Sequence, residues 1–293
     1  MDVLVFGAGS LGSLLGGLLA REHAVTLVGR ESHVGTVDDE GLRVSGAVQT
    51  VVEPAARTAV PDDCAADLAL VTVKAYDTPA AAAALSDCAL AAALSLQNGM
   101  SNEAQLADAL DCPVLAGTCT YGAMLEAPGH VACTGIGEVT LGAREGGAST
   151  LADEVGAAVD AAGIETTVAT DMPVRLWEKL AVNAGINAVT ALARVANGAL
   201  VDGPAGDPAR AAARETARVA RAAGVDLDPE RVTEVAATTS ANVSSMRADV
   251  EAGRPTEIDA INGAVVDRAE DPVPVNRTLA ALVRAWERER DLR

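Results

Sequence analysis

Short apolar runs alternate with amphipathic stretches along about the first 170 residues of the 293-residue chain. The apolar runs are typical of buried strands, and the stretches between them repeat at helical spacing. Alternation of this kind favours βαβ units, in which helices accompany a parallel sheet. We expect strands at Asp2–Phe6, Ala24–Val28, Leu68–Val73 and Leu94–Leu96, and helices at Leu11–Arg21, Thr78–Leu85 and Asn102–Leu110.

Other stretches of the same region indicate antiparallel pairing. Gly41–Val52 reads as a hairpin inserted after the second strand. Turn residues at Pro128-Gly129 and Gly135 separate three further apolar runs, which predict an antiparallel extension of the sheet. These runs are Val114–Met124, His130–Thr134 and Glu138–Leu141.

Strand patterns stop at about Ala169, and the remaining chain is helix-periodic. The sequence therefore predicts an α/β domain over residues 1–169 and an all-helical domain over residues 170–293. Ligands commonly bind where domains meet, so we expect an active site in the cleft between the two. The helical stretches are Asp171–Leu192, Asp207–Ala223, Pro229–Ala236 and Arg277–Arg290.

Charge and composition narrow the classes of function. Lys and Arg number 22 against 41 Asp and Glu, so the acidic chain carries a net charge of −19 and has no basic run. Nucleic acid and anionic membranes are thus not expected as partners. The chain lacks a membrane-length apolar stretch, a secretory signal, a CxxC pair and a histidine cluster, so we expect a cytoplasmic protein without a metal.

Lysine is almost absent: the chain has only Lys74 and Lys179. Abundant acid and alanine with little lysine indicate either a GC-rich genome or a protein that remains soluble at high salt. The two lysines could survive by chance on the surface, or because they are needed.

A glycine-rich motif follows the first predicted strand directly and leads into the first predicted helix. In such a motif Gly7 allows a tight turn, Gly9 lets a pyrophosphate approach the backbone, and Gly12 lets helix and strand pack closely. The simpler interpretation is a flexible glycine turn. The expected cofactor-binding residues here are Gly7, Ala8, Gly9, Ser10, Leu11 and Gly12.

The residue after the second strand indicates which dinucleotide binds. An NAD site would have an acid there, whereas this chain has Arg30, whose guanidinium can fork onto a 2′-phosphate. This favours NADP, although Glu31 is adjacent and Arg30 could be an ordinary surface residue. Lys74 also ends a strand, and ligands of open α/β sheets bind beyond the carboxyl ends of strands.

Two polar groups in the second half are candidates for a site. Lys179, Asn183 and Asn187 are four residues apart and share one helix face, which is either a row of donors at a site or a solvated stripe. Glu257 and Asp259 follow later, but two acids among 41 carry little weight alone.

Taken together, these motifs show that the chain resembles the 2-dehydropantoate 2-reductase (ketopantoate reductase) family from about residue 2 to about residue 285. Each motif is weak by itself, but their order and spacing are specific. The matching motifs are GAGSLG at Gly7–Gly12, VKAYDT at Val73–Thr78, LQNG at Leu96–Gly99, WEKLAVN at Trp177–Asn183, NGAL at Asn197–Leu200, NVSSM at Asn242–Met246 and TEIDAING at Thr256–Gly263.

The resemblance implies an N-terminal Rossmann-like doubly wound sheet followed by an all-helical C-terminal domain, as in 6-phosphogluconate dehydrogenase. It implies NADPH-dependent reduction of 2-dehydropantoate to (R)-pantoate, on the route through pantothenate to coenzyme A. NADH would be a secondary cofactor, no metal would be needed, and the chain would be a monomer or homodimer.

The resemblance also implies roles for individual residues. Arg30 and Lys74 would contact the 2′-phosphate, and Asn98 would lie between nicotinamide and substrate. Lys179 matches the general acid, and Glu257 matches the carboxylate that grips the substrate hydroxyl and orients Lys179. The other substrate-contacting positions match Asn183, Asn187, Asn197, Asn242 and Ser245.

Two other functions remain open from the sequence. One is a dehydrogenase with the same two-domain plan that acts on another 2-oxo or 2-hydroxy acid. The other is an NADP-binding sensor without turnover. Oxidation of NADPH on addition of ketopantoate distinguishes all three.

Overall fold

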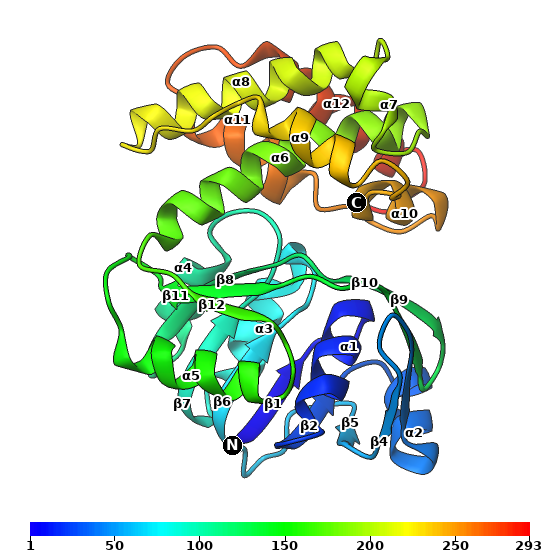
Figure 1. The fold of residues 1–293 in the computed structure, drawn as a ribbon, viewed down its shortest axis with the longest axis vertical. Coiled ribbons are helices and arrows are strands. Elements are labelled where there is room, and N and C mark those ends of the chain that lie inside the picture. The colour runs from blue at the N-terminus through cyan, green and yellow to red at the C-terminus, as the bar shows by residue number, and fades with distance from the viewer. The chain divides into compact units, whose positions relative to one another are not determined.

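The chain folds as two compact units in the computed structural model, which describes all residues from Met1 to Arg293. Unit 1 comprises Met1–Gln97 and Ser101–Met172, and unit 2 comprises Asn98–Met100 and Pro173–Arg293. Unit 1 contains all of the strands and unit 2 only helices (Figure 1). The predicted fold class is confirmed.

Unit 1 contains twelve strands and five α-helices. Several of them begin and end where the sequence predicts, including β1, β2 and α3. The strands are β1 Asp2–Phe6, β2 Ala24–Val28, β3 Leu42–Gly46, β4 Thr50–Val52, β5 Ala55–Arg57, β6 Ala65–Val71, β7 Ala89–Ser95, β8 Val114–Cys119, β9 Gly122–Ala127, β10 His130–Gly135, β11 Val139–Ala143 and β12 Thr166–Val168. The helices are α1 Ser10–Leu19, α2 Glu31–Glu40, the 3₁₀ turn η1 Ala75–Asp77, α3 Thr78–Leu85, α4 Asn102–Ala109 and α5 Thr150–Ala161.

The main sheet has the order β12-β11-β8-β7-β6-β1-β2-β5. Its six strands from β8 to β5 are parallel, and numbered among themselves they give the order 3-2-1-4-5-6 of a dinucleotide-binding sheet. β11 pairs with β8 in the antiparallel sense. The strand order reverses beside β1, which is where such sheets bind their ligands.

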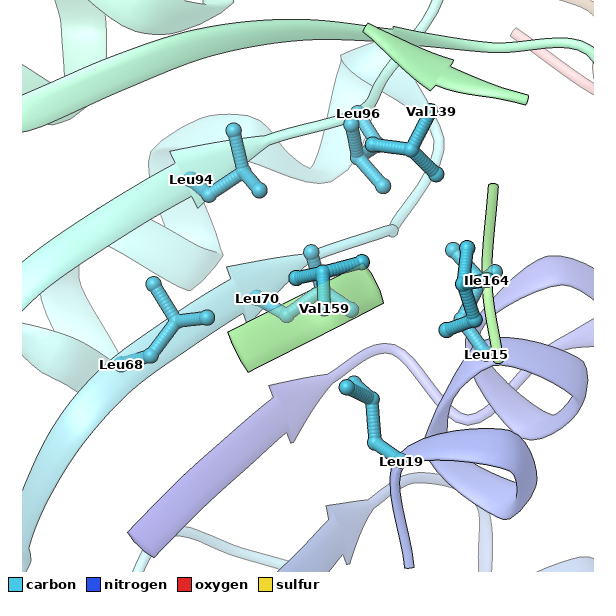
Figure 2. Close-up of a pocket in the computed structure, with 9 residues that line it drawn as sticks. All are labelled: Leu15, Leu19, Leu68, Leu70, Leu94, Leu96, Val139, Val159 and Ile164. Carbon is cyan, nitrogen blue, oxygen red and sulfur yellow. The ribbon is translucent and has the colours of Figure 1, made fainter. Parts of the chain in front are cut away.

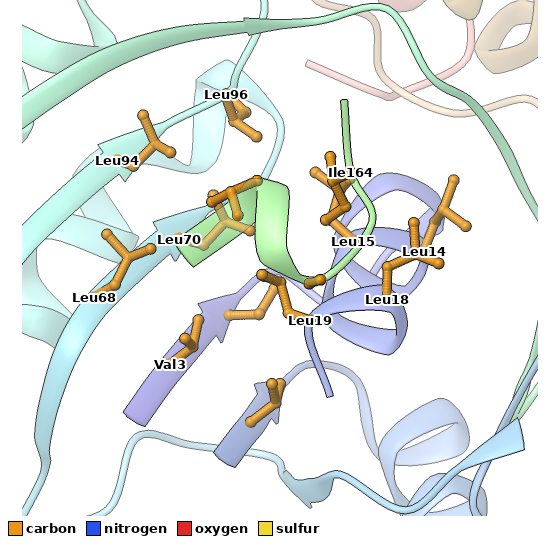
Figure 3. Close-up of a cluster of buried hydrophobic side chains, with 14 of the residues drawn as sticks. Val3, Leu14, Leu15, Leu18, Leu19, Leu68, Leu70, Leu94, Leu96 and Ile164 are labelled. Carbon is orange, nitrogen blue, oxygen red and sulfur yellow. The ribbon is translucent and has the colours of Figure 1, made fainter. Parts of the chain in front are cut away.

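Helices cover both faces of this sheet, because successive side chains of a strand point to opposite faces. Val3 and Leu70 lie in one buried cluster with Leu15 of α1 and Val155 of α5 (Figure 3). Leu4 faces the other way, into a cluster that includes side chains of α3 and α4. The sheet is therefore doubly wound, as predicted.

A second sheet of order β4-β3-β10-β9 corrects one prediction. The hairpin expected over Gly41–Val52 is present as antiparallel β3 and β4. The expected antiparallel extension is present as the pairs β8–β11 and β9–β10, but it is divided between two sheets, because β9 and β10 leave the main sheet while β8 is parallel to β7. β9 instead pairs with β10 across the turn at Pro128-Gly129, and β10 pairs in parallel with β3.

Unit 2 is built from helices around one apolar cluster. None of the helices combines the length and the apolar character that crossing a bilayer requires. Its elements are α6 Met172–Ala193, α7 Ala199–Asp202, α8 Gly206–Ala222, α9 Arg231–Thr238, α10 Ser245–Glu251, the π-helical turn η2 Asp259–Gly263, α11 Ala264–Arg268 and α12 Pro274–Arg288.

Candidate active site

The glycine motif forms a tight turn between β1 and α1. Gly7 has a φ of +111°, and a Cβ there would lie 2.7 Å from Val73 Cγ1 and from the Val73 nitrogen. A Cβ on Gly12 would overlap the carbonyl oxygen of Gly7 and lie 2.5 Å from Thr72 Oγ1. Gly7 and Gly12 are therefore required by the fold of the chain itself.

Gly9 differs from both of these glycines. A Cβ on Gly9 would meet no heavy atom closer than the Gly7 carbonyl oxygen at 4.0 Å, so the backbone is open on that side. Gly9 is also the N-cap of α1, whose first-turn N–H groups have no acceptor within the helix. An open glycine at a helix start with positive partial charge fits the pyrophosphate of a dinucleotide.

Arg30 and Lys74 lie at the same end of the sheet as this turn. β2 and β6 both pair with β1 in parallel, with Phe6 in register with Val28 on one side and Val71 on the other. Arg30 is the exposed N-cap of α2, and Lys74 is the half-buried N-cap of η1. The two cations thus follow the strands on either side of the glycine turn.

The positive charge of Arg30 affects the pKa of a nearby carboxylate, that of Asp77. Burial raises the pKa of Asp77, and the Arg30 guanidinium opposes part of that rise. Asp77 lies at the end of η1, the short helical turn that directly follows Lys74.

His33 is a buried residue of this region that the sequence analysis does not single out. Its Nδ1 accepts the backbone N–H of Gly129 at 3.1 Å, so Nε2 carries the proton and donates to Ser13 Oγ at 2.8 Å. Burial, and then the Arg30 charge, lower the pKa of His33. The neutral imidazole joins α1, α2 and the β9–β10 turn beside Arg30. The signal in the sequence was its spacing, one residue before Val34 and four residues before Val37, which suggests a shared apolar face.

The three polar residues of α6 enter unit 2 to different depths. Lys179 and Asn183 are half-buried, whereas Asn187 is buried. A solvated stripe would be exposed along its whole length. Asn187 is buried, so the interpretation of this row as a solvated stripe is wrong for Asn187.

Other predicted residues lie at the ends of short helices close to one another. The backbone N–H of Asn197 donates to the carbonyl oxygen of Asn242 at 3.1 Å. Asn197 Nδ2 donates to Thr239 Oγ1 at 3.0 Å, while its buried Oδ1 has no partner. Ser245, which is exposed, begins α10 directly after Ser244, whose Oγ lies 2.7 Å from Thr190 Oγ1 of α6.

Glu257 is held beside Asn98, which is 159 residues away in the sequence. Asn98 Nδ2 donates to Glu257 Oε2 at 3.0 Å, and Glu257 is 5% exposed. The next two residues fix this contact, because Gly99 has a φ of +87° against Ala260 and Met100 donates its N–H to the Ala260 oxygen at 3.3 Å. Asn98 therefore belongs structurally to unit 2.

The segment that carries Glu257 also contacts α6. Asn262 Nδ2 donates to the carbonyl oxygen of Ala184 at 3.0 Å, next to Asn183. Unit 2 thus brings Asn98 to Glu257 and Asn197 to Asn242, and it joins the segment that carries Glu257 to α6 at Ala184. Ketone reduction needs a proton donor and polar groups that hold the substrate, and unit 2 contains side chains of both chemical kinds.

One pocket of unit 1 has no polar or ionisable side chain in its lining. It lies in the core of unit 1 and is lined by aliphatic side chains alone (Figure 2). No group of three or more His, Cys, Asp or Glu side chains is placed to hold a metal ion. The pocket residues are Leu15, Leu19, Leu68, Leu70, Leu94, Leu96, Val139, Val159 and Ile164.

Known proteins resemble the chain over its whole length. The family model for ketopantoate reductase PanE/ApbA matches residues 3–146, and the model for its C terminal part matches residues 171–287. A 2-dehydropantoate 2-reductase from Halobacterium salinarum is 46% identical over 302 residues, which cover 99% of this chain and 100% of the relative.

Solved structures agree with these matches. The crystal structure of a PanE/ApbA family ketopantoate reductase from Ralstonia eutropha JMP134 is 34% identical, with a TM-score of 0.91 over 99% of this chain and 100% of the other. A D-mandelate dehydrogenase in ternary complex with NADH and anilino(oxo)acetate has a TM-score of 0.93, with all of both chains covered. At 23% identity, that likeness shows the fold alone. The resemblance predicted from the motifs is confirmed, and the chain belongs to the ketopantoate reductase PanE/ApbA family.

Proposed function

We propose that this protein is a 2-dehydropantoate 2-reductase that uses NADPH to form (R)-pantoate, with Lys179 as the proton donor. The observation that carries the proposal is the full-length relationship to 2-dehydropantoate 2-reductases, among them the relative from Halobacterium salinarum at 46% identity. The candidate residues for each step are all present in the sequence.

The choice of NADPH is supported by charge at the end of the sheet. Gly9 has open space for a pyrophosphate, and Arg30 and Lys74 follow the two strands that flank it. A guanidinium and an ammonium there would bind a 2′-phosphate through charge-assisted hydrogen bonds. NADH lacks this phosphate, so we propose it as a secondary cofactor; the related D-mandelate dehydrogenase structure contains NADH.

Residues of unit 2 would hold and protonate the substrate. NADPH, when bound, would supply the hydride that the ketone carbon accepts, and negative charge would develop on the carbonyl oxygen. The Lys179 ammonium would stabilise that charge and donate its proton to the oxygen, which completes the alcohol. Glu257, held by Asn98, would accept a hydrogen bond from the substrate hydroxyl and orient Lys179. The remaining substrate contacts would come from Asn183, Asn187, Asn197, Asn242 and Ser245.

The test is a steady-state assay that follows loss of NADPH absorbance with ketopantoate and with other 2-oxo acids. We expect the highest kcat/KM for ketopantoate. A higher kcat/KM for another 2-oxo acid would identify a different dehydrogenase of the same fold. Binding of NADPH without turnover of any 2-oxo acid would identify a sensor.

Lys179 is tested by replacing it with arginine and with alanine. Arginine keeps the charge but does not release its proton near neutral pH, so both variants should lose turnover. General acid assistance is worth about 10²- to 10⁴-fold, and we expect kcat to fall within that range. NADPH affinity, measured by fluorescence titration, should not change because Lys179 is not among the proposed cofactor contacts. The matched control is Glu178→Gln at the adjacent exposed position of α6, with normal kcat expected. Near-normal turnover of Lys179→Ala would refute the assignment.

A further inference from the structure

A buried carboxylate near the end of the chain is bonded to the segment that carries Glu257. Glu287 is 1% exposed and lies on the core face of α12, one turn after buried Val283. Its Oε1 accepts both the backbone N–H and the hydroxyl of Thr256, each at 2.7 Å. Its Oε2 accepts from Arg293 Nε at 2.8 Å. These partners satisfy a charge that would otherwise be costly to bury.

Thr256 connects this carboxylate to the backbone on both sides of Glu257. It directly precedes Glu257, and its Oγ1 also accepts the N–H of Ile258 at 3.3 Å. The backbone of Glu257 is thus fixed before and after the residue, while its side chain accepts from Asn98 at 3.0 Å. Movement of Thr256 would therefore move the carboxylate of Glu257.

Two arginines hold the other end of the same segment. Arg284 Nε donates to Asp259 Oδ1 at 2.7 Å, and Arg293 Nη2 donates to Asp259 Oδ2. Burial alone would raise the pKa of Asp259, but the hydrogen bonds and charges of Arg293 and Arg284 outweigh it and hold the pKa below its usual value. We call Glu287, Arg284 and Arg293, with Thr256 and Asp259, the C-terminal clamp.

We infer that Glu287 is a positioning residue for the reduction, which sets the place of the Glu257 carboxylate through Thr256. The inference rests on the proposed function, in which Glu257 contacts the substrate. Stability alone does not require a charge here, because apolar side chains of similar volume often serve a buried site as well or better. Unlike an apolar side chain, the Glu287 carboxylate fixes the direction of the N–H and the hydroxyl of Thr256. Fixing Thr256 in this way keeps the adjacent Glu257 in place.

The experiment compares Glu287→Leu with Glu287→Gln and with the matched control Glu215→Leu. Glu215 is also a buried acid of unit 2, at 4% exposed, and accepts the N–H groups of Val275 and Asn276, but it does not contact Thr256. Misplacement of a catalytic group by about 1 Å can cost about 10²-fold, so we expect kcat of Glu287→Leu to fall about 10- to 100-fold. Glu287→Gln keeps an acceptor for Thr256 and should retain most of the activity. NADPH affinity should be unchanged in all three variants.

The control separates positioning from stability. Glu215→Leu should lower the melting temperature while kcat stays near that of the wild type. Equal loss of kcat in Glu215→Leu and Glu287→Leu, or normal kcat in Glu287→Leu, would overturn the inference. If Glu287→Leu does not fold, Thr256→Val removes the hydroxyl that donates to Glu287 and accepts from Ile258, keeps the backbone N–H, and should lower kcat several-fold; normal kcat in that variant would likewise overturn the inference.

A second readout does not depend on catalysis. Hydrogen–deuterium exchange of the peptide covering residues 252–258, which contains Thr256 but not Asn262, is measured on the full chain without ligands. Glu287→Leu should speed exchange there and Glu215→Leu should not, since only Glu287 accepts the Thr256 N–H. A wild type that does not reduce ketopantoate would defeat the proposed function but leave this exchange comparison decisive for the clamp. Unchanged exchange in Glu287→Leu would overturn the inference.

Discussion

Alanine substitutions at Gly9 and Gly12 distinguish a glycine needed by the cofactor from one needed by the fold. A methyl group on Gly9 meets nothing closer than 4.0 Å, and the residue has an extended backbone that alanine can adopt. A methyl group on Gly12 overlaps the Gly7 oxygen and lies 2.5 Å from Thr72 Oγ1. Gly9→Ala should therefore fold with wild-type stability, whereas Gly12→Ala should be destabilised.

The expected magnitudes follow from these two environments. In the proposed complex the methyl of Gly9→Ala occupies space needed by the pyrophosphate, so at least one charge-assisted hydrogen bond to it is lost. Each such bond is worth about 1.5–3 kcal/mol, which is about a 10- to 100-fold rise in the dissociation constant for NADPH. Overpacking at Gly12 should reduce the free energy of unfolding by about 1–3 kcal/mol.

Two measurements decide the matter. Urea unfolding should give a wild-type midpoint for Gly9→Ala and a lower one for Gly12→Ala, and fluorescence titration should show weakened NADPH binding by Gly9→Ala. Wild-type NADPH affinity in Gly9→Ala would refute the location of the pyrophosphate. A loss of stability in Gly9→Ala similar to that in Gly12→Ala would refute the steric reasoning.

Three further predictions concern charge. Arg30→Ala should raise KM for NADPH about 10- to 100-fold but hardly change KM for NADH, which lacks the 2′-phosphate; equal effects in steady-state kinetics would exclude this role. The pKa of His33 in the folded protein lies below its ordinary 6.5. Just below pH 6.5 the imidazole is therefore protonated in the unfolded chain but still neutral in the native state. Stability should accordingly fall as pH drops below about 6.5, and His33→Gln should flatten that fall in melting curves; parallel curves would contradict it. At a net charge of −19, the melting temperature should rise as potassium chloride reaches molar concentrations, whereas a flat response leaves genome composition as the explanation of the acid excess.

Much of unit 1 could be predicted from the sequence because its signals are local. A buried strand is a short apolar run, and β1 and β2 begin and end as predicted for that reason. The glycine motif was interpretable because it lies between a strand and a helix in the sequence itself. Helix α2 was not predicted, since Gly35 and the β-branched residues around it weaken its helical pattern.

The pairing of strands could not be predicted in the same way. Val114–Met124 forms one apolar run in the sequence, yet the chain divides it between β8 and β9, which belong to different sheets. Which strands pair depends on hydrogen bonds between segments that are distant in the sequence. The local pattern of apolar and polar residues does not specify these hydrogen bonds.

The candidate site shows the same division. The residue types, the spacing of Lys179, Asn183 and Asn187, and the family motifs were all determined by the sequence. Only the tertiary structure places Asn98 against Glu257, buries Asn187 and bonds Glu287 to Thr256. In the sequence Glu287 is one acid in a charged C-terminal stretch, and it becomes a buried partner because α12 turns that face toward the core. Periodicity determines which face of a helix a residue occupies, but the neighbour that it meets is decided by how the helices pack.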